Sequence, residues 1–226
     1  TDIVSETEKL VRLLQLASPA LPVGAYSYSQ GLEAAAHAGI VRDAPSASRW
    51  IGDALALCMA GMEAPILLRL VAAWEARALA AAQRWNGEFV ASRETMELRA
   101  ETLQMGYSLR QLLEGLALDT QLLALIEEPA FPTAFAFAVA AWRIEPPAAL
   151  AAYLFAWLEN QVLAALKCAS FGQTEAQRIL SELAQRLPAV VARAQTLADD
   201  ELVNLAPGLA ILSARHETQY SRIFRS

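Results

Sequence analysis

The most constraining feature of this sequence is a pair of successive apolar segments, 133–144 and 148–170. The first segment is apolar on nearly every side, and the second is apolar on nearly every side over its first half. Prolines bracket the start of the first segment and open the second (Pro129, Pro132 and Pro146-Pro147), as proline often does at the first turn of a helix. A helix without a polar face must be buried in the centre of a fold or at a subunit contact. We therefore expect two deeply buried helices, and we expect the chain to form a homodimer.

The rest of the chain consists of shorter helical patterns separated by proline and glycine, and no alternating pattern predicts a strand. Ser5 and Glu8 have capping-box spacing ahead of a helix that ends before Pro19. Its apolar face is predicted to carry Leu10, Leu13, Leu14 and Ala17. Further helices are predicted at 30–38, 46–62, after Pro65, 77–86 up to Gly87, from 92 onward, 173–197 with a bend near Pro188, and 209–220. This pattern predicts one all-α domain of about ten helices over residues 1–226.

Charge and cysteine usage restrict the partners and the compartment. A net charge of −6 argues against nucleic acid, which requires a basic face. The two cysteines, Cys58 and Cys168, lie far apart in sequence and form no CxxC motif. We therefore expect both to be free thiols in a reducing compartment. Residues 1–8 are acidic and lack the profile of a signal peptide, and the longest apolar run, 148–158, is too short to span a bilayer. We expect a cytoplasmic protein that contacts no membrane.

The sequence contains no recognisable catalytic or metal-binding motif. Its two histidines, His37 and His216, have no second His or Cys within four residues, and no Glu-x-x-His pair is present. A glycine-rich phosphate loop and a GxSxG turn are also missing. We therefore expect a binding or scaffolding protein rather than an enzyme, with no cofactor and no metal site. For His216 we expect a structural hydrogen bond, and for Cys168 a packing role.

The chain turns polar over its last fourteen residues, 213–226, where three arginines lie near a tyrosine, an isoleucine and a phenylalanine. Arginine and aromatic residues often anchor protein interfaces. Two interpretations stay open from composition alone. The segment is either a helix docked on its own core or a tail that a partner protein orders.

Two further charged features admit more than one interpretation. The stretch 93–101, with Glu94, Glu97, Arg99 and Glu101, is the most charged part of the body, and we favour a solvated helix face over a partner contact. Lys167 stands alone in an apolar neighbourhood. It could extend to solvent, pair with a glutamate such as Glu159 or Glu33, or contact a partner.

Four stretches resemble the urease accessory protein UreF family, in the same order along the chain. The first, 13–33, reads LLQLASPALPVGAYSYSQGLE, and the last, 213–226, reads SARHETQYSRIFRS. Between them, RETMELR at 93–99 and LKCASFGQ at 166–173 also match. The likeness spans essentially the whole chain. Two departures are Ala25, where the family usually has a second glycine, and Cys168-Ala169-Ser170, where it usually has Leu-Val-Pro.

The resemblance implies an all-helical, dimeric, non-enzymatic protein that acts in nickel insertion into apo-urease. It would bridge the scaffold protein UreD, called UreH in some systems, and the GTPase UreG. It would also recruit UreG and modulate or couple its GTP hydrolysis. The alternative is a purely structural helical oligomer or scaffold unrelated to urease.

The same resemblance assigns two sets of partner-binding residues. The UreG set comprises Tyr26, Ser27, Ser29, Gln30, Glu33, Lys167 and Gln173. The UreD set comprises Arg215, His216, Glu217, Tyr220, Arg222, Phe224 and Arg225, and it favours a C-terminal tail at 213–226 that a partner orders. The two sets are therefore expected to form separate surfaces, one for each partner.

Overall fold

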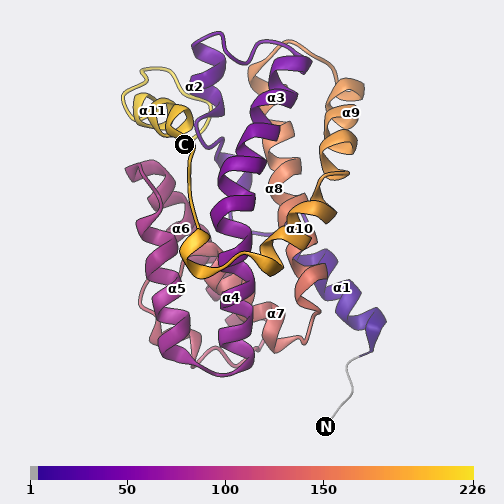
Figure 1. Ribbon diagram of the computed structural model, residues 1–226, viewed down its shortest axis with the longest axis vertical. Coiled ribbons are helices and arrows are strands. Elements are labelled where there is room, and N and C mark those ends of the chain that lie inside the picture. The colour runs from indigo at the N-terminus through magenta and orange to yellow at the C-terminus, as the bar shows by residue number, and fades with distance from the viewer. Residues whose placement is uncertain (1–4) are drawn as a thin grey trace.

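The computed structural model describes residues 5–226, so residues 1–4 of the acidic stretch 1–8 lie outside it. Over the described range the fold is all-α, as predicted, and contains no strand. Eleven α-helices form it (Figure 1): α1 Glu6–Ala17, α2 Leu32–His37, α3 Ala44–Ala54, α4 Ala64–Glu75, α5 Leu79–Ala91, α6 Met96–Gly115, α7 Phe131–Ala141, α8 Pro146–Cys168, α9 Gln173–Ala184, α10 Leu187–Thr196 and α11 Pro207–His216. Short 3-10 turns at Ala25–Ser27, Leu123–Leu125 and Asp199–Glu201 and a π-helical segment at Leu55–Glu63 complete the described elements.

Helix α7 is buried within its own chain, against α4 and α6. The Trp74 and Phe137 rings meet edge to face with centroids 5.2 Å apart. The indole N–H of Trp74 also donates to the carbonyl of Thr133 at 3.1 Å. Packing inside the monomer therefore accounts for the apolar character of α7, and that character no longer requires a subunit contact.

Helices α3 and α4 form one continuous rod through a π-helical segment, Leu55–Glu63, where the sequence predicts a break ahead of Pro65 (Figure 1). Proline does not break the rod because it stands in the first turn of α4, immediately after the wider π turns. The rod Ala44–Glu75 has 32 residues and α8 has 23, so both are long and apolar enough to cross a membrane. Most of the apolar part of the rod and half of that of α8 are buried inside the protein, as in core helices.

Other boundaries match the predictions in part. Ser5 caps α1 by accepting the N–H of Glu8 at 3.1 Å, as expected. The predicted 173–197 helix does divide ahead of Pro188, into α9 and α10. The predicted helix end at Gly87 is wrong, because Gly87 lies inside α5. Glycine lowers helix propensity but does not block a helix. The predicted apolar face of α1 is not buried as a whole, since Leu10 and Leu14 are exposed to solvent.

Helix α6 closely approaches the segment just before α7 at Gly106. A Cβ atom at this position would lie 1.9 Å from the carbonyl oxygen of Pro129. Only a residue without a side chain fits there. This contact fixes the position of α6, which carries two of the glutamates of the candidate site.

Candidate functional site

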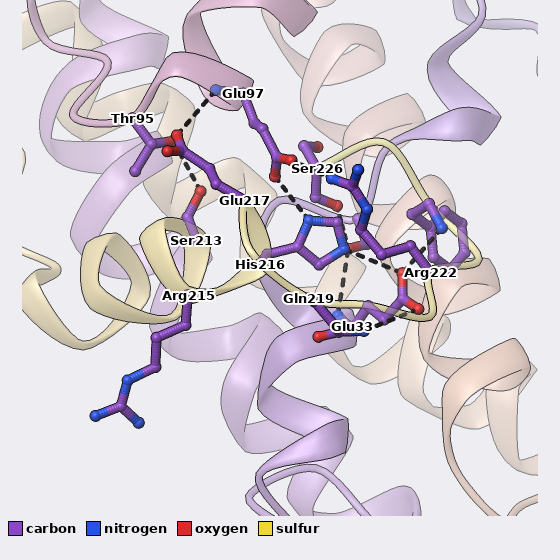
Figure 2. A network of polar contacts seen from close by, with 12 residues as sticks. Glu33, Thr95, Glu97, Ser213, Arg215, His216, Glu217, Gln219, Arg222 and Ser226 are labelled. Atoms are coloured by element: carbon purple, nitrogen blue, oxygen red, sulfur yellow. Dashed lines mark hydrogen bonds and ion pairs between the residues drawn. The ribbon is translucent and has the colours of Figure 1, made fainter.

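The carboxylate of Glu33, in the first turn of α2, collects four donors from the end of the chain (Figure 2). The backbone N–H groups of Ile223 and Phe224 donate to it at 2.7 and 2.9 Å. The side-chain amide of Gln219 lies at 3.4 Å, and Nε2 of His216 at 3.2 Å. Glu33 is only 6% exposed, so these bonds replace the water that a buried carboxylate loses. Glu33 therefore anchors the C-terminal segment to α2.

His216 joins this anchor to α6. Its ring is fully buried, with Nε2 facing Glu33 and Nδ1 lying 2.7 Å from Oε2 of Glu97. Figure 2 shows the ring between the two carboxylates. An imidazolium, which donates from both nitrogens, satisfies both acceptors. The guanidinium of Arg222 also binds Glu97, at 2.7 Å from Oε1.

Glu101, one helical turn beyond Glu97, binds the last residue of the chain. The hydroxyl of Ser226 donates to Oε2 at 2.8 Å, and the amide of Gln30 donates to Oε1 at 2.7 Å. Burial raises the pKa of Glu101 to about 7, an effect that these two hydrogen bonds oppose. The prediction that Glu97 and Glu101 form a solvated helix face is therefore wrong. Their carboxyl groups hold the C-terminal segment through long-range contacts that no local spacing reveals.

The loop before α2 is bonded directly to the chain end. The N–H of Ser29 donates to the carbonyl of Ser226 at 2.9 Å, and its hydroxyl donates to the same oxygen. The N–H of Arg225 donates to the carbonyl of Ser27 at 2.8 Å. Gln30 has a positive φ of 53°, an unfavourable backbone for a residue with a side chain. Its amide is held between Glu101 and the indole N–H of Trp157, which stabilises that conformation.

A second contact fastens α11 to the start of α6. The carboxylate of Glu217 accepts the N–H of Met96 at 2.8 Å and lies 3.4 Å from that of Glu97. Thr95 caps α6 and shares a 2.8 Å hydrogen bond with the hydroxyl of Ser213. A carboxylate at a helix N-terminus satisfies free N–H groups and complements the helix dipole. Glu217 thus serves the fold of its own chain.

Lys167 is exposed and extends to the same segment, with Nζ 5.2 Å from the centroid of the buried Phe224 ring. No ion pair joins it to Glu159 or Glu33 within residues 5–226. The structure shows the side chain extending to solvent, with a cation–π contact to Phe224, and contact of Lys167 with a partner stays a prediction.

The two predicted partner sets therefore meet in one cluster, which we call the Glu33 cluster. It consists of Ser27, Ser29, Gln30, Glu33, Glu97, Glu101, Lys167, His216, Gln219, Arg222, Phe224 and Ser226. Sequence reasoning missed Gln219 and Ser226, and it placed Glu97 and Glu101 on the surface. Gln173 is exposed at the start of α9, and no hydrogen bond of its side chain to the cluster is found among the described residues.

The members of the two sets differ in what they offer to a partner. Ser29, Glu33, His216 and Phe224 are buried. Tyr26 is 67% exposed and Tyr220 is fully exposed, and Arg215 points away from the cluster in Figure 2. Bonds within the chain hold the buried half of 213–226, which matches the docked interpretation for that half. Contact of its exposed half with a partner stays a prediction.

Both sequence departures fit the local backbone. Gly24 takes the left-handed conformation with φ of 80°, and Ala25 begins the following 3-10 turn, where a side chain is tolerated. Ser170 donates its N–H to the carbonyl of Arg42 at 3.1 Å, a bond that proline could not make. Cys168 packs beside a core cluster, and burial raises the pKa of its thiol to about 11, so it is a poor nucleophile at neutral pH. In the part of the chain that the structure describes, no group of three metal-ligating side chains comes together.

Comparison with known proteins gives the family. The family model for UreF matches residues 41–184. The urease accessory protein UreF of Azoarcus sp. (strain BH72) is 56% identical over 223 residues, covering 96% of this chain and 95% of the relative. The UreF protein of Dechloromonas aromatica (strain RCB) is 52% identical, covering 96% of this chain and 98% of the relative. That of Janthinobacterium sp. (strain Marseille) is 49% identical, covering 98% of this chain and 100% of the relative.

These relationships rule out the alternative of a helical scaffold unrelated to urease. They also agree with the prediction that the chain is not an enzyme. The chain belongs to the UreF family of non-catalytic urease accessory proteins, which act in urease maturation.

Proposed function

We propose that this protein is a cytoplasmic bridge between UreD (UreH) and the GTPase UreG during nickel insertion into apo-urease. It recruits UreG and modulates or couples its GTP hydrolysis. The observation that carries the proposal is the Glu33 cluster, in which the segments expected to bind the two partners are bonded to each other. Direct hydrogen bonds, such as that from the N–H of Ser29 to Ser226, therefore connect the two segments.

The exposed members of the two sets are the proposed contact residues, and the buried members hold them in place. Tyr26, Lys167 and Gln173 would contact UreG. Arg215, Tyr220, Arg222 and Arg225 would contact UreD, together with Ile223, which is 65% exposed. Exposed aromatic and arginine side chains on a fixed backbone suit an interface because little conformational entropy is lost on binding.

We also propose that the protein is a homodimer and that α1 supplies its contact. Leu10, Val11 and Leu14 are each more than half exposed, which leaves an apolar stripe on one helix. Figure 1 shows α1 projecting at the lower right, whereas α11 and the C-terminus lie at the upper left. A dimer formed through α1 would leave the Glu33 cluster free for partners.

Co-purification from a strain that expresses this chain with UreD, UreG and apo-urease tests the bridge. The proposal expects tagged UreD to retain UreG only when this chain is present. Retention of UreG by UreD alone would contradict the bridging role. Urease activity in the same strain then reports whether the assembled complex is productive.

A further inference from the structure

A cavity of about 120 Å³ lies beneath the end of α1, between α6, α7 and α8. Its walls are largely apolar, and Leu16, Leu21, Met105, Phe131 and Phe135 contribute to them. Tyr26, Glu159, Asn160 and Leu163 are also among its lining residues, and all four are at least partly exposed. The cavity therefore combines an apolar interior with access from solvent. The partner-binding proposal uses Tyr26, Gln30 and Glu101 of its lining but assigns no ligand to the cavity itself.

The polar groups of this cavity carry an excess of negative charge. Glu63, Glu101 and Glu159 line it, against one cation, Arg93. Arg93 is already used, since its guanidinium lies 3.2 Å from Glu63 in a buried ion pair. The phenol of Tyr153 donates to the other oxygen of Glu63 at 2.5 Å, which completes that group. Neither Glu101 nor Glu159 forms an ion pair among the described residues, and Arg93 acts on Glu101 only at longer range.

Glu101 is the lining residue that we expect to bind a ligand. Its side chain is 6% exposed, and its only hydrogen-bond donors in the described chain are the uncharged groups of Gln30 and Ser226. A buried carboxylate without a cation is costly, and each of its oxygens can accept a second hydrogen bond. Burial raises the pKa of this carboxyl to about 7, so a cation beside it would increase its ionised fraction at neutral pH.

The lining also indicates what kind of cation fits. A metal ion would need several oxygen, nitrogen or sulfur ligands, and the described residues bring no such group together. Apolar walls instead favour a ligand with a hydrocarbon stem, as in a primary amine or a guanidine.

We propose that this cavity binds an organic cation with a short hydrocarbon stem, whose stem lies against Phe131 and Phe135 and whose ammonium or guanidinium group donates to Glu101. The cation is either a free small molecule or the side chain of a partner's lysine or arginine. Both sources present the same chemistry to the cavity.

Calorimetric titration of the purified full chain with n-butylguanidinium, n-butylammonium, n-butanol and butyrate tests the proposal. The cations should bind with dissociation constants on the order of millimolar, and the alcohol and the acid should bind roughly tenfold more weakly or not at all. Glu101→Gln should weaken the binding of both cations by roughly tenfold, whereas Glu88→Gln, on an exposed surface of α5, should leave it unchanged. Thermal unfolding of each variant establishes that it is folded.

A second variant keeps the proposal testable if Glu101→Gln does not fold. Ala156→Leu adds volume to the cavity lining and retains Glu101, and it should also abolish cation binding. Binding of n-butanol as tight as that of the cations, an unaltered affinity in Glu101→Gln, or no saturable binding by either cation would overturn the proposal.

A competition experiment distinguishes the two possible sources of the cation, a free small molecule and a partner's basic side chain. Saturating n-butylguanidinium is added to the capture of UreG or UreD by the wild-type chain. Loss of capture identifies a partner's basic side chain as the natural occupant, and unchanged capture identifies a free small molecule. Direct binding of the probes does not depend on either partner, so failure of the bridging role would leave this result intact.

Discussion

Nδ1 of His216 lies 2.7 Å from Oε2 of Glu97, although 119 residues separate the two in sequence. Because Nε2 of the same ring faces Glu33, one buried side chain connects α11 to both α6 and α2. The C-terminal segment is therefore part of the folded body at its buried positions and a free surface only at its exposed ones. A substitution in this region should be assigned to fold or to partner binding according to that division.

Glu33→Gln should loosen the end of the chain without unfolding the body. The variant keeps one acceptor oxygen and places an amide N–H₂ group opposite donors, so it loses charge-assisted bonds worth about 1.5–3 kcal/mol of stability. Hydrogen exchange should show faster exchange of the Ile223 and Phe224 amides. Exchange in α7 should change little, and Glu88→Gln serves as the control. Unchanged exchange of the Ile223 and Phe224 amides would show that Glu33 does not anchor the segment.

Glu101→Gln should change how stability depends on pH. The folded pKa of Glu101 is about 7, above its ordinary value of 4.5, so ionisation is disfavoured in the folded state. The wild type should therefore lose stability relative to the variant as pH rises from about 4.5 through 7, by up to about 3 kcal/mol. Urea unfolding of both proteins at pH 5 and pH 8 measures this. A stability difference that is the same at both values would contradict the assignment.

Gly106→Ala should be severely destabilising, because its Cβ would overlap the Pro129 carbonyl and push α7 away from α6. We expect a loss of at least about 3 kcal/mol or an insoluble protein. Gly87→Ala is the matched control, since nothing lies within 4 Å of its Cβ and it stands inside α5. It should stabilise the protein by about 0.5–1 kcal/mol. Thermal unfolding of the pair gives the comparison, and equal effects would mean that the close approach is not present.

Leu10→Glu combined with Leu14→Glu should convert the proposed dimer to a monomer. Both positions are more than half exposed, so the monomer fold should tolerate the charges, whereas an apolar contact between copies should not. Light scattering after size exclusion gives the mass, and circular dichroism checks helicity. The same exchange at the exposed Leu125 is the control. A double variant with the mass of the wild type would exclude α1 as the contact.

The sequence predicts this fold well where local chemistry decides it. The cap at Ser5, the proline-opened helices α7 and α8 and the break ahead of Pro188 all follow from residues within one or two turns. It fails where an unusual helical turn or packing against distant segments decides the structure. The π-helical turns carry the rod past Pro65, and core packing accounts for an apolar α7 that also suggested a subunit contact.

The candidate site shows the same limit. Motif resemblance located both of its segments, but nothing in either segment revealed that they bond to each other. Glu97 and Glu101 looked like solvent-facing charges because their partners lie about 70 to 125 residues away in sequence. Burial of a charged residue is a tertiary property, and no helical spacing encodes it.

In the proposed bridge, the exposed side of the C-terminal segment binds UreD while its buried side holds the fold. Capture of UreD by the variant Tyr220→Ala with Ile223→Ala tests this most directly, because both side chains are exposed in the free chain. Leu125→Ala is the matched surface control. We predict a thermal midpoint close to that of the wild type for both proteins, with UreD capture lost roughly tenfold or more only in the double variant. Full UreD capture by a folded double variant would contradict the account.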